Sequence, residues 1–452
     1  MSNSYCTPLD ITQIEQNFSE INPAFSPAEA MHEANRCLYC YDAPCMHACP
    51  THIDVPSFIK KIASGNLLGS ARVIFDANPI GASCARVCPV EVLCEGACVE
   101  KTLLHKPIEI GRLQRHATDY AMSNDKQIFE KGEPNGKSVG IVGSGPAGLS
   151  CATYLARLGY DVTVYERREK AGGLDTYGMA EYKMPQTVSL SEAEHVAKMG
   201  VKFLLNTEIV AAGSGDPEEL GAVNRVSFEL LREWHDAVFL AVGLGDTNKL
   251  NIPGEDLDGV YDALAFIEKI KTRDWMNVPL GKTVAVIGAG NTAIDAVTQA
   301  KRLGAERVIL IYRRTEQDAP AYDYELELAR KDGVEFLWQT TPVEIGGHSS
   351  VSGLRLRHGG GEYKIDCDMV IKAIGQQKMT SFFTDVIGVN VDEKGRVVIG
   401  ENMQTSDPKI FSGGDCANGG KEAVDASQMG KLGAQGIHQT LTGEIVSFAG
   451  AS

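Results

Sequence analysis

The sequence predicts an α/β protein with an α-helical, cysteine-rich N-terminal module followed by two domains that are built on mostly parallel sheets. Three observations lead to this prediction. Eight of the twelve cysteines lie between Cys37 and Cys98. A strand, a glycine turn, a helix and a second strand begin at residue 138, and the same pattern returns 145 residues later at residue 283. Two such βαβ openings in one chain indicate two nucleotide-binding domains.

The composition is that of an ordinary globular protein with an excess of acidic residues. The chain has 452 residues, of which 43% are hydrophobic and 23% charged, and its formal net charge is −16. This net charge repels nucleic-acid phosphates and anionic lipids, so we expect neither nucleic acid nor membrane as a partner. The polar N-terminus has no signal-peptide core, and no apolar run reaches the roughly 18 residues of a membrane helix. We therefore expect a cytoplasmic protein.

The N-terminal module is expected to be helical. Apolar residues recur at helical spacing in "DVPSFIKKIASGNLLGSARVIF" (54–75) and "PIEIGRLQRHATDYAM" (107–122), and clear alternating strands are absent. The segment "KGEPNGK" (131–137) is rich in glycine, proline and asparagine. We interpret it as the linker that ends the module.

The first βαβ opening has the spacing of a dinucleotide-binding fingerprint. Gly143, Gly145 and Gly148 follow the apolar run 139–142, and Glu166 ends the next strand, eighteen residues after Gly148. The first glycine permits a tight turn, the second lets the backbone approach a pyrophosphate, and the third lets helix and strand pack closely. The acid accepts from a ribose hydroxyl. We assign this fingerprint to a tightly bound FAD, with candidate contacts at Gly143, Gly145, Pro146, Ala147, Gly148 and Glu166.

The second opening is assigned to a nicotinamide coenzyme. Its third glycine is replaced by alanine, which the fingerprint allows, and its second strand ends in Arg313 and Arg314 instead of an acid. Arginine suits a 2′-phosphate through charge-assisted bonds, so NADPH is favoured over NADH. The nearby Glu316 and Asp318 weaken this preference and leave NADH open. The candidate contacts are Gly288, Gly290, Asn291, Thr292, Ala293, Arg313 and Arg314.

The cysteine spacing indicates iron–sulfur clusters. Residues 37–50 read C-x2-C-x4-C-x3-C-P, and residues 84–98 read C-x3-C-P-x4-C-x3-C. Bacterial ferredoxins have a C-x2-C-x2-C-x3-C-P run whose last cysteine serves the other cluster. Zinc sites prefer C-x2-C pairs, of which only one is present, and disulfides are disfavoured in a cytosolic chain.

Two stretches in the C-terminal half resemble those of flavoproteins with two dinucleotide-binding domains. The motif "SGGDC" (412–416) resembles their late flavin motif, which implies that Gly414 and Asp415 contact the flavin. The loops "AVGLG" (241–245) and "AIGQ" (373–376) resemble the family's crossing points between the domains, and the second contains Gly375, a further candidate NAD(P) contact. By this resemblance the NAD(P) domain is inserted into the FAD domain. We expect a helical domain at 1–136, FAD domain parts at 137–249 and 376–452, and the NAD(P) domain at 250–375.

A closer resemblance covers nearly the whole chain. "CLYCYDAPCMHACP", "GASCARVCPVEVLCEGAC" and "PIEIGRLQRHATDY" resemble the N-terminal module of dihydropyrimidine dehydrogenases, and "GGDCANGGKEAVDASQMGK" continues the likeness. The flavin and iron–sulfur subunit of the bacterial two-subunit enzyme is the most similar member that we identify. The small subunit of glutamate synthase shares this architecture. In this family the module is a ferredoxin-like domain that holds two 4Fe–4S clusters.

The resemblance implies a ligand set for each cluster. One cluster is implied to be held by Cys37, Cys40, Cys45 and Cys98, and the other by Cys49, Cys88, Cys94 and Gln114. Counting cysteines alone would choose Cys84 instead of Gln114 as the last ligand, and this choice stays open. The resemblance also brings Gly173, Leu174 and Lys183 to the flavin, although relatives usually carry arginine at the last position.

The implied function is that of an electron-input subunit. Electrons would pass from NAD(P)H through FAD and the two clusters to a separate FMN-containing subunit, which reduces uracil or thymine to 5,6-dihydropyrimidines. Because the chain ends at Ser452 without the FMN-binding barrel of full-length members, we expect the partner to supply it. No catalytic acid, base or nucleophile is predicted, since motifs such as H-E-x-x-H and G-x-S-x-G are absent.

Three other functions remain in view. The chain could supply electrons to glutamate synthase or to a ferredoxin:NADP oxidoreductase complex, and the identity of the partner would decide. A disulfide reductase shares the two-domain plan but needs a redox-active cysteine pair, and no pair follows Cys98. A binding or scaffold protein whose clusters are only structural is the third alternative, but it would give the second dinucleotide fingerprint no function.

Overall fold

The computed structural model describes residues 9–211 and 224–449, which form two compact units. The inserted unit comprises residues 9–21, 177–185 and 245–377, and the main unit comprises the other described residues. The sequence predicts the NAD(P) domain at 250–375 and places the two shorter segments in other domains. The cysteine module and both parts of the predicted FAD domain share the main unit.

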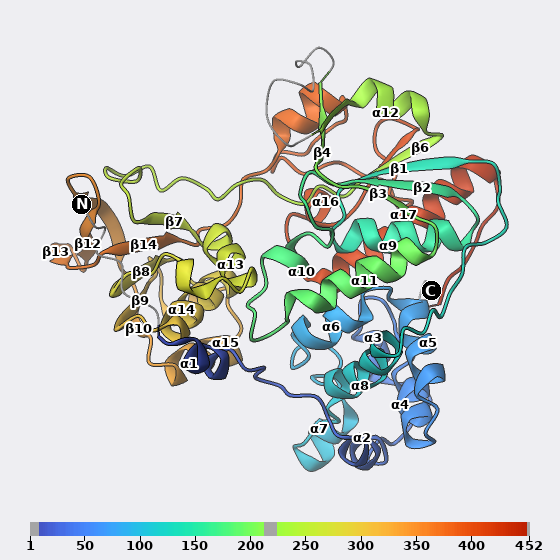
Figure 1. Ribbon diagram of the computed structural model, residues 1–452, viewed down its shortest axis with the longest axis horizontal. Coiled ribbons are helices and arrows are strands. Elements are labelled where there is room, and N and C mark those ends of the chain that lie inside the picture. Colours follow the sequence, from blue (N-terminus) through green and yellow to red (C-terminus); the bar gives the residue numbers. More distant parts are fainter. Residues whose placement is uncertain (1–8, 212–223, 450–452) are drawn as a thin grey trace. The chain divides into compact units, whose positions relative to one another are not determined.

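The main unit is built around a five-stranded parallel sheet (Figure 1). Its strand order is β15 (Ile410–Ser412), β6 (Ala237–Leu240), β1 (Ser138–Val142), β2 (Asp161–Tyr165) and β3 (Lys202–Leu204). Strand β15 follows the inserted unit in the chain, whereas the other four precede it. The sheet is therefore completed from both sides of the insertion. A separate parallel pair is formed by β4 (Thr207–Val210) and β5 (Asn224–Ser227).

Two helices of the main unit, α9 (Pro146–Arg157) and α17 (Ala423–Thr442), pack closely against each other. Glycines on α17 permit this approach and the packing of α17 on β6. A Cβ atom at Gly430 would lie 2.2 Å from the carbonyl oxygen of Ala147, and one at Gly433 would lie 2.3 Å from the ring of Phe239. The remaining helical elements of the sheet domain are α10 (Leu174–Tyr177), α11 (Gln186–Lys198), α12 (Phe228–Trp234), α16 (Asp415–Asn418) and a π-helix at Phe382–Ile387.

The cysteine module is helical, as its sequence predicts, and no strand occurs between residues 22 and 136. The first predicted region, 54–75, forms α4 (Val55–Ala63) and most of α5 (Leu67–Ala77), and the second forms α8 (Ile110–Ser123). Helix α2 (Pro27–Ala34) begins with a capping box of Ser26 and Glu29, which satisfies two backbone donors. The other helices are α3 (Pro44–His47), α6 (Gly81–Val87) and α7 (Val99–Leu104).

The module and the sheet domain share one hydrophobic core. Ile80 and Cys84 of the module are buried in the same cluster as Val139 of the sheet. At its edge the Tyr154 hydroxyl donates to the carbonyl of Asp76 over 2.8 Å, and an Arg157 nitrogen lies 2.6 Å from the Asp76 carboxylate. Figure 1 shows the module's helices next to α9 and α11.

The inserted unit has a second five-stranded parallel sheet. Its order is β10 (Glu335–Leu337), β9 (Arg307–Ile311), β8 (Thr283–Ile287), β14 (Met369–Lys372) and β7 (Val260–Asp262). A three-stranded antiparallel sheet accompanies it, formed by β11 (Thr341–Gly347), β12 (Val351–His358) and β13 (Gly361–Ile365). The helices are α1 (Ile11–Asn17), α13 (Ala263–Lys271), α14 (Asn291–Leu303) and α15 (Asp323–Lys331), with 3-10 turns at Trp275–Asn277 and Glu316–Asp318.

The first described residues are anchored in the inserted unit. Ile14 and Phe18 are buried in its core, and the Phe18 ring stacks on Trp275 with ring centroids 5.4 Å apart. Burial of such side chains stabilises a fold by about 1.5–3 kcal/mol each. The N–H of Leu9 also donates to the carbonyl of Leu303 over 3.2 Å.

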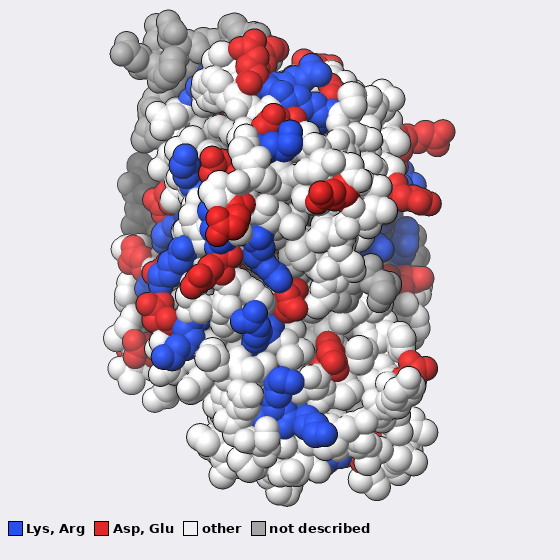
Figure 2. Space-filling model, turned by 90° about the vertical axis from the view of Figure 1, so that its right-hand side faces the viewer, with Lys and Arg blue, Asp and Glu red and all other residues white. Residues whose placement is uncertain are grey.

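Charged side chains are interspersed on the face of the molecule that Figure 2 shows. Lysine and arginine lie among aspartate and glutamate there, and no large field of one sign covers that face. The formal net charge of −16 is a property of the whole chain.

Candidate functional site

The first fingerprint has the geometry that a bound pyrophosphate needs. Gly143 has φ +99°, and a Cβ there would lie 2.4 Å from the carbonyl oxygen of Ala241. A Cβ at Gly148 would lie 2.1 Å from the carbonyl oxygen of Gly143. In contrast, a Cβ at Gly145 would meet nothing closer than 3.9 Å. Packing therefore requires glycine at positions 143 and 148, whereas Gly145 leaves the backbone open in front of a helix.

Helix α9 begins directly behind this open backbone. Gly145 is its N-cap residue and Pro146 its first residue, followed by Ala147. A helix N-terminus presents free N–H groups and a partial positive charge, which attract an anion. The predicted contacts Pro146 and Ala147 therefore lie where a phosphate group would bind.

Glu166 follows β2 and is almost fully buried, with 6% of its surface exposed. One of its oxygens accepts from the backbone N–H of Ser144 over 3.0 Å and from the Ser144 hydroxyl over 2.6 Å, and the other accepts from the N–H of Arg168 over 2.9 Å. A carboxylate has about four acceptor positions, so capacity remains for a ribose hydroxyl. Ser144 fixes this carboxylate, a role that the sequence does not reveal because serine occupies a variable position of the fingerprint.

Two predicted flavin contacts from other segments, Gly173 and Gly414, lie close to the start of α9. A Cβ at Gly173, which has φ +58°, would lie 2.7 Å from the Cα of Gly145. A Cβ at Gly414, which has φ +78°, would lie 3.0 Å from the Cβ of Ala147. Leu174 and Asp415 each begin a short helix directly after these glycines.

Asp415 follows Gly414 directly in the chain and is half-buried. Burial raises the pKa of this group above its ordinary value, and a hydrogen bond from the N–H of Lys421 opposes the shift. The structure therefore brings Gly173, Gly414 and Asp415 to the first fingerprint from segments more than 230 residues apart.

Lys183, the remaining predicted flavin contact, belongs to the inserted unit. Its ammonium lies 2.6 Å from the Asp295 carboxylate and 2.5 Å from the Glu325 carboxylate, both buried. Burial favours the neutral amine, but the nearby Asp295, Tyr182 and Glu325 raise the pKa of Lys183 well above its usual range. The flavin contact of Lys183 stays a prediction, and the structure gives the ammonium two other partners.

The second fingerprint opens into a cavity of about 730 Å³ in the inserted unit. Gly288 has φ +128°, and its Cβ would lie 2.1 Å from the carbonyl oxygen of Ala373. Gly290 is open, with Pro320 as its nearest neighbour at 3.9 Å. Ala293 is fully buried at the packing position. The predicted residues that line the cavity are Gly288, Gly290, Thr292, Arg313, Arg314 and Gly375.

Asn291 lies at the start of α14, where its side-chain oxygen accepts from the N–H of Tyr322 over 3.2 Å. Lys372 also lines the cavity, although no sequence motif marks it. Its ammonium lies 3.0 Å from Glu255 and 3.2 Å from Asp262. Although burial opposes the charge, these carboxylates raise the pKa of Lys372.

Arg313 and Arg314 are exposed at the edge of this cavity. Among the described residues, no carboxylate forms an ion pair with either guanidinium. The two acids that weakened the NADPH assignment have other partners. Glu316 pairs with Arg330, and an Asp318 oxygen accepts from the Thr315 hydroxyl over 2.6 Å.

The structure brings the first predicted cluster set together. Cys37, Cys40, Cys45 and Cys98 line one small cavity in the cysteine module, with apolar neighbours such as Val55. Burial and the nearby thiols of Cys98, Cys37 and Cys40 raise the pKa of Cys45 to about 12. The free thiol is therefore protonated at neutral pH, and binding of a metal cluster would release its proton.

The three cysteines of the second predicted set also lie near one another. The pKa of Cys88 is raised well above its usual value by a hydrogen bond with Cys84, by burial, and by the nearby thiols of Cys84, Cys49 and Cys94. Burial raises the pKa of Cys94, and Cys49 contributes to this shift. Among the described residues, no three histidine, cysteine or acidic side chains are close enough to hold a single metal ion.

Gln114 and Cys84, the two alternatives for the last ligand, lie on the neighbouring helices α8 and α6. Gln114 is buried, and its amide nitrogen donates to the carbonyl of Gly81 over 2.7 Å. The amide oxygen of Gln114 is available to a ligand, because no described residue donates a hydrogen bond to it. Cys84 is fully buried and hydrogen-bonds through its thiol with Cys88.

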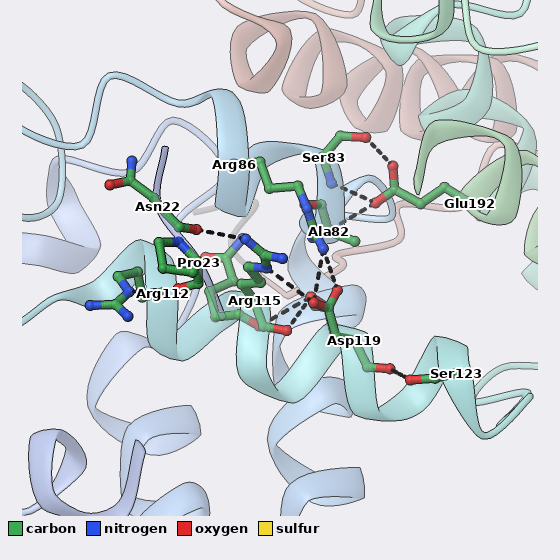
Figure 3. A network of polar contacts seen from close by, with 12 residues as sticks. Asn22, Pro23, Ala82, Ser83, Arg86, Arg112, Arg115, Asp119, Ser123 and Glu192 are labelled. Atoms are coloured by element: carbon green, nitrogen blue, oxygen red, sulfur yellow. Dashed lines mark hydrogen bonds and ion pairs between the residues drawn. The ribbon is translucent and has the colours of Figure 1, made fainter. Parts of the chain in front are cut away.

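A network of polar contacts fixes these helices (Figure 3). Arg86 of α6 donates to both oxygens of Asp119 on α8 over 2.8 Å, and Arg115 donates to the same carboxylate over 3.1 Å. On the other side of α6, the Glu192 carboxylate of α11 accepts from the N–H groups of Ala82 (2.7 Å) and Ser83 (3.0 Å). The segment that contains Cys84 and Cys88 is therefore attached both to its own module and to the sheet domain.

The described residues fit the cofactors that the sequence predicts. Open backbone precedes a helix N-terminus at each fingerprint, and two groups of cysteine thiols lie near one another in the module. Thiolates are the usual protein ligands of iron–sulfur clusters. In the part of the chain that the structure describes, none of the helices is both long enough and apolar enough to span a membrane.

Family models match both halves of this arrangement. A model described as pyridine nucleotide-disulphide oxidoreductase matches residues 137–430. A second, described as dihydropyrimidine dehydrogenase domain II, 4Fe-4S cluster, matches residues 14–126. The two matches correspond to the sheet domains and to the cysteine module.

Individual relatives match over almost their whole length. The NAD-dependent dihydropyrimidine dehydrogenase subunit PreT of Salmonella typhimurium is 34% identical over 428 residues, which cover 94% of this chain and 98% of the relative. The glutamate synthase (NADPH) small chain of Escherichia coli is 35% identical over 463 residues, which cover 95% of both. The thioredoxin reductase of T. acidophilum has a similar fold, with a TM-score of 0.53 and 22% identity over 67% of this chain and 98% of that chain.

These findings confirm the predicted α/β fold class and the family resemblance. They also confirm FAD, NAD(P)H and 4Fe–4S clusters as the cofactors. The chain belongs to the pyridine nucleotide-disulphide oxidoreductase family and is an NAD(P)H-dependent flavin and iron–sulfur oxidoreductase.

Proposed function

We propose that the chain is the electron-input subunit of a two-component dihydropyrimidine dehydrogenase. The observation that carries this proposal is the 34% identity to a dihydropyrimidine dehydrogenase subunit over 94% of the chain, which includes the cysteine module. The partner would be an FMN-containing subunit that reduces uracil or thymine. One NAD(P)H supplies two electrons, and reduction of the pyrimidine C5–C6 double bond takes two electrons and two protons.

Each part of the chain would contribute a separate task. The inserted unit would bind the coenzyme pyrophosphate at the open backbone of Gly290. The main unit would bind FAD at Gly145, with Glu166 on the ribose and Gly173, Leu174, Gly414 and Asp415 nearby. When bound, a flavin accepts electrons in pairs and releases them singly, which no side chain of the protein does.

The cysteine module would hold two clusters with interleaved ligands. The cavity shared by four cysteines supports one set, which is Cys37, Cys40, Cys45 and Cys98. The mutual influence of the Cys49, Cys88 and Cys94 thiols supports the other, which Gln114 would complete. The hydrogen bond from the Gln114 amide to Gly81 supports the use of its oxygen as a ligand.

NADPH is the coenzyme that the cavity supports best. Arg313 and Arg314 line its edge, and among the described residues neither forms an ion pair with a carboxylate, although the Asp318 carboxylate interacts with Arg314 at longer range. Both guanidinium groups can therefore approach a 2′-phosphate. This favours a second candidate function, because the glutamate synthase small chain that resembles this protein is named for NADPH. In that case the partner would be the large chain of a glutamate synthase.

The purified chain is expected to oxidise NADPH with artificial electron acceptors but to leave uracil unchanged. Uracil reduction should begin only when an FMN-containing partner subunit is added, because in this proposal the pyrimidine binds to the partner. The assay follows NADPH oxidation and dihydrouracil formation anaerobically, with NADH in place of NADPH in a parallel series. A preference for NADPH of at least tenfold in kcat/KM is expected from the arginine pair.

Addition of a glutamate synthase large chain is the matched alternative in the same assay. If electrons reach the glutamate synthase large chain and not the pyrimidine-reducing subunit, the protein is the electron-input subunit of a glutamate synthase and not of a dihydropyrimidine dehydrogenase. Reduction of uracil by the isolated chain would contradict the need for a partner.

A Gln114→Ala variant is expected to lose or alter the EPR signal of one cluster, whereas Cys84→Ala should leave both signals intact. The amide oxygen of Gln114 would be removed as a ligand, while the Cys84 thiol is engaged with its neighbour Cys88. EPR spectra of the dithionite-reduced variants, with iron and sulfide content, provide the measurement. The reverse pattern would show that Cys84, not Gln114, completes the second cluster.

A further inference from the structure

A fully buried lysine, Lys431, lies where helix α17 meets the cysteine module. The residue is 0% exposed. Its ammonium donates to the carbonyl of Thr51 over 3.1 Å and to the carbonyl of Ala449 over 2.9 Å. Thr51 is also fully buried, and its hydroxyl lies 3.3 Å from the sulfur of Cys49. The lysine therefore reaches the segment that contains a predicted ligand of the second cluster.

Helix α17 is held firmly at this point, so the position of Lys431 is well defined. One turn before it, the Ser427 hydroxyl donates to the side-chain oxygen of Asn78 in the module over 2.8 Å. The Ser427 carbonyl accepts from the Ser150 hydroxyl of α9 over 2.6 Å. Ser427 and Lys431 are four residues apart and so lie on the same face of the helix, which faces the module.

No carboxylate neutralises the Lys431 ammonium directly. Among the described residues, no acidic side chain lies within ion-pair distance of it, and the nearby Asp76 is paired with Arg157 at 2.6 Å. The other groups that act on the ammonium are the Tyr154 ring, 5.8 Å away, the thiol of Cys49 and the guanidinium of Arg157. A buried charge without a partner is costly, so an uncompensated lysine at this place calls for an explanation.

We propose that Lys431 is the positive charge that sets the reduction midpoint of the second cluster. The proposal rests on the proposed ligand set, in which Cys49 binds that cluster. Deprotonated cysteines give such a site negative charge, which the buried ammonium offsets. Since a positive charge favours an added electron, Lys431 would make this cluster easier to reduce, and hydrogen bonding and nearby charge are known controls of cluster potential. Lys431 is a positioning and charge-setting residue, not a ligand.

The test is an anaerobic EPR redox titration of the cluster-loaded chain and three variants. Lys431→Gln removes the charge but keeps a hydrogen-bond donor, and Lys431→Arg keeps the charge. Lys202→Gln makes the same charge change at an exposed position on β3 and serves as the control. We expect Lys431→Gln to weaken the one-electron reduction of one cluster about tenfold, a shift of about 59 mV to lower potential. The other cluster, Lys431→Arg and the control should stay within about threefold of the wild-type values.

Several results would overturn the inference. One is an unchanged reduction midpoint in Lys431→Gln, and another is an equal shift in the Gln and Arg variants. Loss of both clusters from the Gln variant would show that Lys431 has a purely structural role. Failure of the proposed function is recognised separately in the unmodified chain. If iron and EPR analysis find no second cluster there, the ligand assignment fails before any variant is compared.

Discussion

A Gly145→Val variant is expected to fold but to purify without flavin, whereas a Gly290→Val variant should keep its flavin and lose its response to NADPH. Both glycines have extended backbone that any residue adopts, with φ of −68° and −87°. An added Cβ would meet nothing closer than 3.9 Å at either position. The fold has room for the first side-chain atom, so the effect should fall on the ligands.

The physical reason is the same at both fingerprints. The new side chain would occupy the space in front of a helix N-terminus, where the pyrophosphate approaches the backbone. We expect each substitution to weaken binding of its own cofactor at least about 100-fold, or about 2.7 kcal/mol. Flavin content after purification and anaerobic bleaching of the flavin by NADPH measure the two effects.

Each variant is the control for the other. A shared loss of flavin would indicate general unfolding, which circular dichroism would reveal. Stoichiometric flavin in Gly145→Val would contradict the assignment of the first fingerprint to FAD. Rapid bleaching of Gly290→Val by NADPH would contradict the assignment of the second fingerprint.

The parts of the site that the sequence predicted well are local in the chain. The turn glycines, the start of α9 and the acid after β2 lie within 24 residues, from Gly143 to Glu166. Their spacing is dictated by one βαβ unit, so that one sequence window contains the whole geometry. The helices of the cysteine module were likewise visible in the periodicity of short apolar stretches.

The parts that the sequence did not reveal depend on contacts between distant residues. Lys431 and Thr51 are 380 positions apart, and no motif connects them. Lys372 lies at the end of an interior strand, and it reaches the cavity of the second fingerprint because β14 pairs with β8. Segments 9–21 and 177–185 belong to the inserted unit through buried side chains such as Phe18 and Tyr182, which sequence spacing does not indicate.

The cysteines are an intermediate case. Their spacing indicates clusters, but by itself it does not say which cysteines share one. The fold places Cys98, at the start of α7, at the cavity of Cys37, Cys40 and Cys45. The family resemblance had implied this grouping.

The pH dependence of stability is expected to change when Glu192 is replaced by glutamine. Glu192 is 3% exposed and accepts from Ala82, Ser83 and the Ser83 hydroxyl (Figure 3). Burial raises its pKa from 4.5 to about 7, although these three donors oppose the shift. In the folded chain the carboxyl therefore holds its proton up to about pH 7, whereas in the unfolded chain it loses the proton near pH 4.5.

The sign of the effect follows from this difference. Between pH 4.5 and 7 the folded state binds more protons than the unfolded state, so the free energy of unfolding falls as the pH rises. A shift of about 2.5 pKa units corresponds to a contribution on the order of 3 kcal/mol. Glutamine keeps an oxygen for the two N–H groups and a donor for the Ser83 hydroxyl, but it does not titrate. Glu192→Gln should match the wild type at pH 5 and exceed its stability by about 2–3 kcal/mol at pH 8.

Urea unfolding at pH 5, 6, 7 and 8 measures this difference, with Glu194→Gln as the control on the exposed side of the same helix. Glu192→Ala should be destabilised at every pH by about 2–4 kcal/mol, because it leaves buried donors of α6 without an acceptor. Parallel pH profiles for the wild type and Glu192→Gln would mean that the carboxylate stays ionised in the fold. In that case the helix N-terminus would outweigh the desolvation of Glu192, and the attachment of the cysteine segment to α11 would be an ionic one.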